Sequence, residues 1–386
     1  MNELKPGWKM VKFGDIAQNV AVRVDPADAK TDVYVGLEHL DPSTIHLRQW
    51  GHPSDVTGQK LAFKKGDVIF GRRRAYQRKL AIAEFDGICS AHAMVVRAKP
   101  KMILPEFLPF FLQSDMFMER AIEISVGSLS PTINWKTLRE QVFPLPPLDQ
   151  QKRVADILWA ADEVIERWLE VAINLEITGK TLRTELIHNS EFPKERLSDV
   201  CVLKGGSTFK PAFQGKRAGR YPFIKVSDMN SVGNEEFISV AENYVDECDI
   251  RQMKTTVFPK GAVVFAKVGA ALLLNRRRML VAETCIDNNM MAAIPNHEKL
   301  ITEFLYLFML DVDFRNYVQE GALPSINNKI VGEITIPIPP INDQKDIVSK
   351  HRAVMSGFAE VNKNIRLSLE MVSSLLSDNL EGAAHV

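Results

Sequence analysis

The sequence PLPPLDQQKRV, from Pro144 to Val154, returns as PIPPINDQKDI from Pro337 to Ile347 and so reveals how the chain is organised. The two copies align without a gap and lie about 193 residues apart in a chain of 386 residues. This period is far longer than the unit of a solenoid repeat and has the size of a whole domain. The sequence therefore predicts two similar modules, each followed by the same proline-rich segment.

Two further motifs repeat in the same order. FKKGDVIF at residues 63–70 returns as FPKGAVVF at residues 258–265, and both place a turn glycine ahead of an apolar, strand-like run. GSLSPTIN at residues 127–134 returns as GALPSIN at residues 321–327, with one residue lost. Agreement at three separate motifs makes chance resemblance between the halves improbable.

Each copy also contains an apolar, helix-like segment, at residues 107–122 and 304–318. Strand-like runs with glycine turns therefore precede a helical segment in both halves. We predict an α+β fold with two similar globular domains, each a small twisted sheet with helices.

A long helix is predicted after each pair of prolines. Asp149 and Asn342 stand at equivalent places, and both residue types cap helix N-termini. From there apolar residues recur at alternating steps of four and three, the pattern of a coiled-coil seam. In the first copy the seam comprises Val154, Leu158, Ala161, Ile165, Trp168, Leu175 and Leu182. In the second copy it comprises Ile347, Val354, Phe358, Val361, Ile365 and Leu375, with polar residues between them.

These helices are longer than a compact domain requires. A helix over residues 150–188 would extend about 58 Å at about 1.5 Å per residue. An ordinary amphipathic surface helix is one interpretation, but the length and the duplication favour two helices that pair with each other. We therefore divide the chain into domains at 1–147 and 191–340, and long spacer helices at 148–190 and 341–386.

Composition is that of a globular protein, with 46% hydrophobic and 25% charged residues and a formal net charge of zero. This net charge is not evenly distributed, because residues 1–147 have a basic excess and residues 148–190 have an acidic excess. The chain contains no apolar run of the roughly eighteen residues that a membrane span requires, and its first residues are charged, so we expect a cytoplasmic protein without membrane contact. The four cysteines are widely spaced and are expected to be reduced, mostly buried thiols.

The order domain, P-x-P-P-x-x-x-Q-K helix, domain, P-x-P-P-x-x-x-Q-K helix resembles the specificity (S) subunits of type I restriction-modification systems. The resemblance covers essentially the whole chain. Its motif residues are Pro146, Pro147, Gln151 and Lys152 in the first copy, and Pro339, Pro340, Gln344 and Lys345 in the second. The strand-start glycines Gly66 and Gly261 also match the family, although Ala262 replaces the usual Asp, which is Asp67 in the first copy.

The resemblance implies a function for each part. The globular domains would be target-recognition domains, and the long helices would form an antiparallel coiled coil that spaces them. The implied partners are double-stranded DNA, two methyltransferase subunits, and restriction and translocase subunits. This chain would carry no cofactor, and S-adenosylmethionine, ATP and magnesium would belong to the partner subunits. Because the two domains differ in sequence, the DNA target should have two unlike halves separated by an unread spacer.

Basic clusters are the candidate DNA contacts, because arginine neutralises phosphates and can donate two hydrogen bonds to guanine. In the first copy they are Arg72, Arg73, Arg74, Arg78, Lys79, Lys60 and Lys64. In the second copy they are Lys267, Arg276, Arg277, Arg278, Lys210, Lys216 and Arg217. Solvated surface charge without a partner is the alternative for each cluster. Asn134 and Asn327 could contact adenine, but a turn or helix-cap role is at least as consistent with the sequence.

Catalysis within this chain is not expected. The sequence has no N/D-P-P-Y/F methyltransferase motif, no phosphate loop for ATP and no dinucleotide-binding glycine motif. His92 lies in an apolar run, which favours a buried structural histidine over a catalytic one. Two alternatives stay open: the specificity subunit of a type IIB-like enzyme, and a nuclease that uses scattered carboxylates.

Overall fold

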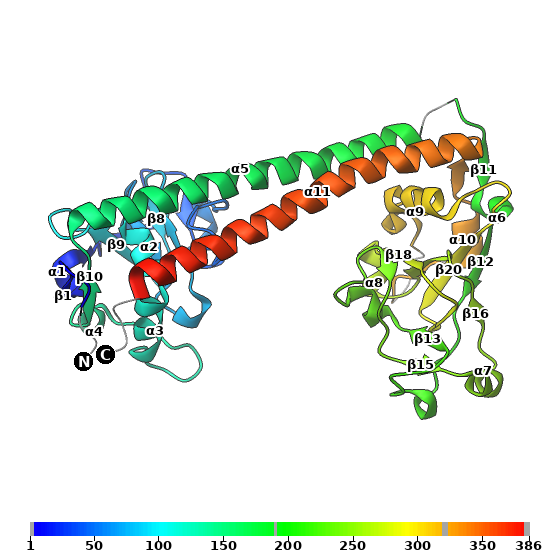
Figure 1. Ribbon diagram of the computed structural model, residues 1–386, viewed down its shortest axis with the longest axis horizontal. Coiled ribbons are helices and arrows are strands. Elements are labelled where there is room, and N and C mark those ends of the chain that lie inside the picture. Colours follow the sequence, from blue (N-terminus) through cyan, green and yellow to red (C-terminus); the bar gives the residue numbers. More distant parts are fainter. Residues whose placement is uncertain (1–3, 189–190, 319–322, 382–386) are drawn as a thin grey trace. The chain divides into compact units, whose positions relative to one another are not determined.

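The computed structural model describes residues 4–188, 191–318 and 323–381, so the beginning of the GALPSIN motif, residues 321–322, lies outside the described residues. The chain forms two compact units, and each takes part of both long helices. Unit 1 comprises residues 1–170 and 362–386, and unit 2 comprises residues 171–361. Figure 1 labels the elements of both units.

Unit 1 is built on two four-stranded sheets and a two-stranded ribbon. The sheet orders are β2-β9-β6-β7 and β3-β5-β8-β4, and β1 pairs with β10. The strands are β1 (Lys9–Lys12), β2 (Ala17–Asn19), β3 (Arg23–Val24), β4 (Tyr34–Val35), β5 (Lys60–Phe63), β6 (Val68–Phe70), β7 (Leu80–Ile82), β8 (Gly87–Cys89), β9 (Met94–Ala98) and β10 (Val142–Leu145). The helices are α1 (Phe13–Ile16), α2 (Leu108–Gln113), α3 (Asp115–Glu123) and α4 (Trp135–Leu138), with 3-10 turns η1 (Pro26–Asp28), η2 (Pro53–Asp55) and η3 (Ala75–Gln77).

Aromatic packing forms the centre of unit 1. The rings of Phe13, Phe111, Phe117 and Phe143 lie with centroids 5.2–6.5 Å apart, and all four side chains are buried. The predicted helix at 107–122 is interrupted at Ser114, whose hydroxyl accepts a hydrogen bond from the Phe117 N–H and caps α3.

Unit 2 repeats this plan. Its sheet orders are β12-β20-β17-β18-β14 and β15-β13-β19-β16, and β11 pairs with β21. The strands are β11 (Lys194–Arg196), β12 (Cys201–Gly205), β13 (Tyr221–Ile224), β14 (Phe237–Ile238), β15 (Tyr244–Val245), β16 (Val257–Phe258), β17 (Val263–Ala266), β18 (Arg277–Leu280), β19 (Thr284–Ile286), β20 (Met290–Pro295) and β21 (Thr335–Pro337). The helices are α6 (Leu197–Val200), α7 (Glu247–Met253), α8 (Ala270–Leu273), α9 (Thr302–Asp311) and α10 (Asn328–Gly332), with 3-10 turns η4 (Pro211–Phe213), η5 (Val226–Asn230) and η6 (Phe314–Tyr317).

The departure at Ala262 has a structural counterpart. In unit 1 the buried carboxylate of Asp67 accepts hydrogen bonds of 2.6 and 2.8 Å from Arg97. The strand registers put Ala262 and Ile294 at the corresponding places of unit 2, and both belong to an apolar cluster there. An ion pair in one module is thus exchanged for apolar packing in the other, a replacement that folded proteins tolerate well.

The long helices are α5 (Leu148–Ile187) and α11 (Ile341–Leu376), and α11 continues into a π-helical turn at Ser377–Glu381. They begin one residue before Asp149 and Asn342, so these residues lie inside the first turn and the predicted capping positions were wrong by two residues. The amides of Gln150 and Gln151 both donate to the Pro147 carbonyl, which opens α5. A proline suits this position because its ring fixes a φ compatible with the start of a helix.

The predicted seam is buried or half-buried at every position. In unit 1, Val154, Leu158, Ala161, Ile165 and Ile365 are each at most 9% exposed. In unit 2, Gly179 of α5 lies against Val354 and Met355 of α11, and Leu175 lies against Gly357. Since the α5 number falls as the α11 number rises, these segments run antiparallel.

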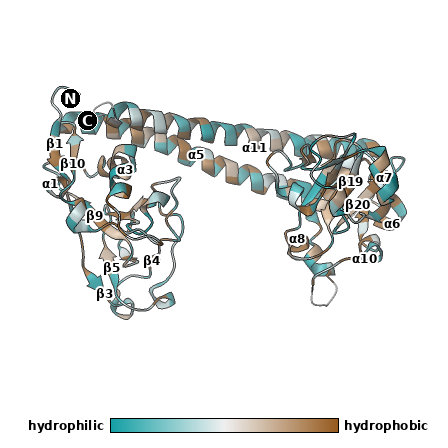
Figure 2. Cartoon of the chain, turned by 90° about the horizontal axis from the view of Figure 1, so that it is seen from below, coloured by the Kyte–Doolittle hydropathy of each residue, from teal (hydrophilic) through white to brown (hydrophobic). Residues whose placement is uncertain are grey.

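Figure 2 shows hydrophobic and hydrophilic residues alternating along both helices, as amphipathic helices require. Among the described residues, no helix combines the length and apolar character that crossing a membrane requires.

Candidate nucleic-acid interface

The arginine-rich loop of unit 1 follows strand β6 and is held by the repeated GSLSPTIN motif. The carbonyl of Arg72 accepts a hydrogen bond of 2.9 Å from the Ile133 N–H. The N–H of Arg74 donates to the Pro131 carbonyl over 2.7 Å, and Arg74 itself has a φ of 57°. A left-handed backbone at arginine is uncommon, so these bonds fix a conformation that the loop would otherwise rarely adopt.

Unit 2 makes the same two bonds. The Lys267 carbonyl accepts from the Ile326 N–H over 3.0 Å, and the Gly269 N–H donates to the Pro324 carbonyl over 2.8 Å. Gly269 also has a positive φ, of 75°. Lys267 therefore stands where Arg72 stands in unit 1, so the arginines at 276–278 do not occupy the place of Arg72, Arg73 and Arg74.

The arginine side chains of the first loop use only some of their hydrogen-bond donors within the protein. Arg72 donates to the Ala91 carbonyl over 3.0 Å, and Arg74 donates to the Ser130 hydroxyl over 3.3 Å. Arg73 lies 3.4 Å from the Nε2 of His92. Farther along, Arg78 forms an ion pair with Asp115, and Lys79 donates to the Leu37 carbonyl over 2.9 Å.

The side chain of His92 is exposed, so the prediction of a buried histidine is wrong, and its pKa reflects the positive charge of this region. Partial burial lowers the pKa of His92, and the positive charges of Arg73, Arg72 and Lys60 lower it further. A neutral imidazole surrounded by cations is consistent with a local positive potential that favours an anionic polymer. Lys60 donates to the Gly58 carbonyl over 2.9 Å, and the side chain of Lys64 is exposed.

The second arginine triplet is mostly structural. Arg277 has no exposed surface, donates to the carbonyls of Asn275 and Val312, and stacks 4.1 Å from the Phe314 ring centroid. Burial lowers the pKa of Arg277 to about 10.

Arg278 donates to backbone carbonyls, including that of Met229 over 2.9 Å, and burial lowers its pKa also. The side chain of Arg276 is exposed, so Arg276 is the member of the triplet placed to meet a ligand.

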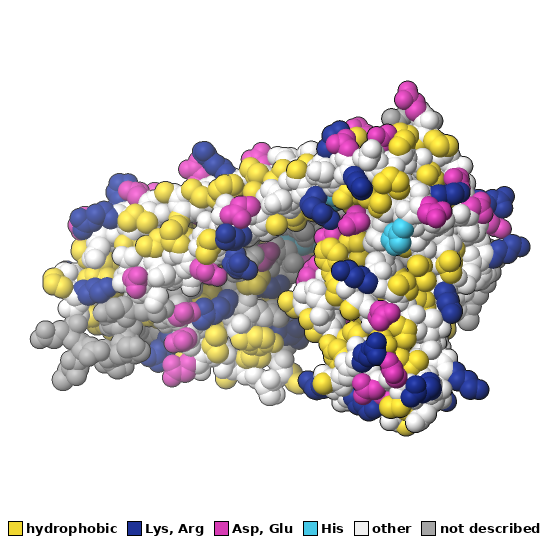
Figure 3. All heavy atoms as spheres, turned by 45° about the vertical axis from the view of Figure 1, so that its right-hand side comes forward, with side chains coloured by type: hydrophobic (Ala, Val, Ile, Leu, Met, Phe, Trp, Pro, Cys, Tyr) yellow, Lys and Arg dark blue, Asp and Glu magenta, His cyan; other side chains and the backbone are white. Residues whose placement is uncertain are grey.

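The remaining basic candidates of the second copy lie between β12 and β13 of unit 2. Lys210 and Arg217 are exposed, whereas Lys216 pairs with Asp249 over 2.7 Å and the pKa of Lys216 is raised by that hydrogen bond. On the face that Figure 3 presents, basic and acidic side chains of unit 2 are interspersed. Asn327 caps α10, since its side chain accepts a hydrogen bond from the Ile330 N–H. This is the helix-cap role that the sequence allowed as the alternative to an adenine contact.

Two groups of polar residues escaped the sequence analysis. A cavity beside Arg72 is also lined by Asn19, Arg23 and Gln59. These residues lie far from Arg72 in the sequence, and no motif marks them. The register of β3 and β5, with Arg23 opposite Leu61, brings them together.

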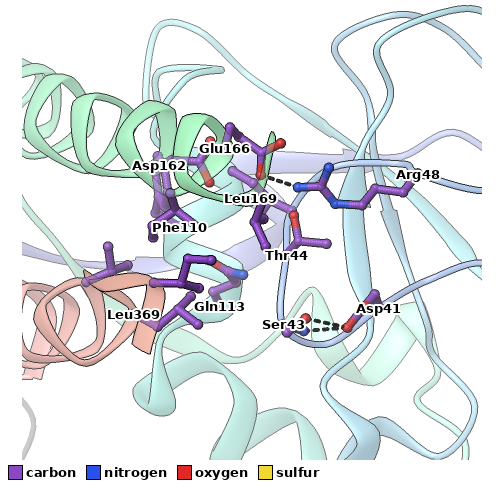
Figure 4. Close-up of a pocket in the computed structure, with 14 residues that line it drawn as sticks. Asp41, Ser43, Thr44, Arg48, Phe110, Gln113, Asp162, Glu166, Leu169 and Leu369 are labelled. Atoms are coloured by element: carbon purple, nitrogen blue, oxygen red, sulfur yellow. Dashed lines mark hydrogen bonds and ion pairs between the residues drawn. The ribbon is translucent and has the colours of Figure 1, made fainter. Parts of the chain in front are cut away.

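The second group joins the loop between β4 and β5 to helix α5 within unit 1. His46, Asp162 and Glu166 place their ligand atoms within 4.8 Å of one another, a spacing that a divalent cation could use. Figure 4 shows Asp162 and Glu166 of α5 at a neighbouring cavity of about 280 Å³, with Arg48 paired to Glu166. Because Arg48 already neutralises Glu166, the group serves here as an ionic contact between loop and helix.

The cysteines agree with the expectation of reduced and mostly buried thiols. All four are free; Cys89, Cys201 and Cys285 are buried, and Cys248 is exposed. Burial raises the pKa of each buried thiol to about 12, so these groups stay protonated and unreactive.

Comparison with known proteins identifies relatives along the whole chain. The EcoDI specificity subunit of Escherichia coli is 28% identical over 55% of this chain, and the match spans about half, 51%, of that relative. The putative MjaX specificity subunit of Methanocaldococcus jannaschii is 22% identical over 92% of this chain and 88% of its own length.

Solved structures show the same fold. A chain from a study of complex assembly and conformational transition of the type I R-M system matches with a TM-score of 0.65, at 19% identity over 99% of both chains. The type I S subunit of M. genitalium matches with a TM-score of 0.56, at 13% identity over 98% of this chain and 97% of that chain.

The sequence profile described as the type I restriction modification DNA specificity domain matches twice, over residues 6–178 and 189–371. Each match contains one recognition module with its basic loop and most of the long helix that follows. The chain therefore belongs to the type I restriction-modification specificity subunit family, with one specificity domain in each half.

Proposed function

We propose that the chain is the DNA-reading subunit of a type I restriction-modification complex and selects a two-part, asymmetric target. The observation that carries the proposal is the duplicated loop: Arg72 and Lys267 follow equivalent core strands and are held by equivalent backbone bonds. In each unit the loop has the same fixed backbone and one cationic side chain, but the neighbouring side chains differ. Each loop can therefore present different side chains to its own half of the DNA target.

The asymmetry of the target follows from what differs between the loops. Arg73 and Arg74 in unit 1 correspond to Val268 and Gly269 in unit 2. Two similar scaffolds with unlike side chains should recognise unlike sequences. We propose that α5 and α11, each an unbroken helix of 36 residues or more, set the length of the unread spacer.

Partner subunits would supply the chemistry. Exposed apolar residues at Ile157, Val164 and Val171 recur every seven residues on α5 and offer a surface for a methyltransferase subunit. S-adenosylmethionine would enter with two methyltransferase subunits, and ATP and magnesium with restriction subunits. The chain would act in the cytoplasm, without catalysis of its own.

Mapping methylated bases in the genome of the source strain, with and without this gene, tests the proposal. We expect a split motif with two unlike halves in the wild type and its complete loss in the deletion strain. A methylation pattern that survives deletion would refute the proposal. As a complement, the purified chain incubated with DNA and magnesium should leave the DNA uncut and unmodified.

A further inference from the structure

The cavity beside Arg72 contains two buried polar atoms that lack partners. It measures about 260 Å³ and lies between β2, the β3–β5 pair and the arginine loop of unit 1. The Nε of Arg72 is a hydrogen-bond donor and the Oδ1 of Asn19 is an acceptor, and neither has a partner among the described residues. Buried polar atoms are nearly always paired, so an unpaired donor and an unpaired acceptor in one cavity mark a place where a polar ligand can pair with both.

The charges around the cavity restrict the ligand. Arg23, Lys60 and Arg72 line it, and its lining contains no acidic residue. Arg23 is held by Gln59 over 3.3 Å, and Lys60 is held by backbone carbonyls. The cavity is therefore suited to a ligand that is negatively charged or that lies next to negatively charged groups.

A phosphate alone does not fit this set of groups. Phosphate oxygens are acceptors, so they could satisfy Arg72 but would leave the Asn19 oxygen unpaired. The major-groove edge of a base pair presents an acceptor next to a donor, as in guanine O6 and N7 beside the cytosine amino group, or adenine N7 beside its own amino group. Such an edge offers an acceptor for the Arg72 Nε and a donor for the Asn19 Oδ1, and Arg23 and Lys60 could neutralise the flanking phosphates.

We propose that this cavity reads one base pair in one half of the target, with Arg72 donating to the base edge and Asn19 accepting from it. The inference rests on the proposed function and adds to it the residues that set specificity at one position. In unit 2 the corresponding Lys267 ammonium lies against Gly205, since a Cβ built there would be 2.9 Å from its Nζ. That half has a different donor in the same place and should therefore prefer a different base.

The test uses the methylation map of strains in which the gene carries Asn19→Leu or Arg72→Met. Both substitutions keep much of the side-chain volume and remove the polar atom. We expect the motif to persist but to lose preference at one base pair of one half-site, on the order of tenfold or more at that position. Lys101→Ala removes an exposed cation of unit 1 that neither lines the cavity nor belongs to the candidate DNA contacts, and it should leave the motif unchanged.

Several results would overturn the inference. An unchanged motif in both variants would mean that solvent fills the cavity. Uniformly reduced methylation at every site, with the motif intact, would make Arg72 a phosphate contact. If either variant fails to accumulate or melts early after purification, Asn19→Ser and Arg72→Lys replace them under the same criteria. A wild-type strain without a split motif would instead refute the proposed function itself, which separates the two failures.

Discussion

The Nε2 of His46 lies 2.7 Å from the Oδ2 of Asp162, which joins a loop of the first recognition module to helix α5. On its other side the Nδ1 of His46 lies 2.6 Å from Glu84. Glu166 adds a further negative charge, and Trp159 of α5 packs edge-on against the imidazole. With a carboxylate at each nitrogen, the imidazole is held as a doubly protonated cation. The hydrogen bond to Asp162, first among these causes, raises the pKa of His46 to about 9.

This contact predicts a stability that falls as the pH rises. Because the pKa of His46 in the folded chain lies above the usual value of about 6.5, its contribution is complete below about pH 6.5 and is lost as the pH rises through 9. Urea unfolding of wild type and His46→Gln should differ by about 2 kcal/mol at pH 6 and converge near pH 10. His297→Gln, at an exposed histidine of unit 2, is the control and should track the wild type throughout. A His46 difference independent of pH would contradict the ionic contact.

In the Gln-Lys pair of the repeated motif, we expect the glutamine to be important for the stability of the fold and the lysine to be dispensable for it. The side-chain amide of Gln151 accepts from the Leu104 N–H and donates to the carbonyls of Met102 and Pro146, at 2.9–3.0 Å. Gln151→Ala leaves these buried groups unpaired and should lower the unfolding free energy by about 2–4 kcal/mol. Lys152→Ala, which removes only an exposed pair with Asp156, should cost less than about 0.5 kcal/mol. Equal effects in urea titrations would contradict this division.

Gln344 makes the same three contacts in unit 2, with Ile301, Lys299 and Pro339, at 2.8–2.9 Å. These contacts explain why both copies of the motif contain the glutamine: one glutamine in each half fastens the start of a long helix to its own unit. The sequence predicted the helices and the seam because periodic burial is local information. It could not reveal this role of the glutamines, because two of the three partners of each glutamine lie more than 40 residues away in the chain.

The basic clusters show the limit of sequence reasoning more sharply. Arg276, Arg277 and Arg278 look alike in the sequence, but Arg276 lies just before strand β18 and is exposed, whereas Arg277, the first residue of that strand, is buried. A run of three arginines contains no apolar residue that would indicate which of them is buried. Asn19 was missed for a related reason, because only the tertiary register brings it beside Arg72.

Arg277 and Arg276 therefore make a matched pair for stability. Arg277→Met leaves the carbonyls of Asn275 and Val312 without their donor and should lower the unfolding free energy by about 2–3 kcal/mol. Arg276→Met, at the exposed neighbour, should stay within about 0.5 kcal/mol of wild type. Chemical denaturation of the two variants checks this, and a neutral result for Arg277 would contradict its structural role.

The loop arginines predict a change in salt dependence. Replacing Arg73 by Gln and Arg74 by Asn, which tolerates the left-handed backbone, removes two charges without forcing the loop to change conformation. If both meet phosphates, the slope of log affinity against log salt for DNA binding should become shallower by about 2. Arg167→Gln, on the exposed face of α5, should leave the slope unchanged. An unaltered slope in the double variant would show that these arginines do not contact DNA phosphates.

Substitutions at two adjacent residues of α5 should have different effects, one on the folding of the helix pair and the other on partner binding. Ile165 is 7% exposed on the seam, whereas Val164 is 45% exposed. Ile165→Asp places a carboxylate among apolar side chains, so it should lower the melting temperature and the helix content measured by circular dichroism. Val164→Asp should leave both unchanged but weaken co-purification of a methyltransferase subunit, because it interrupts the exposed Ile157, Val164 and Val171 stripe. If Val164→Asp instead unfolds the chain while Ile165→Asp does not, the seam runs along the other face of the helix.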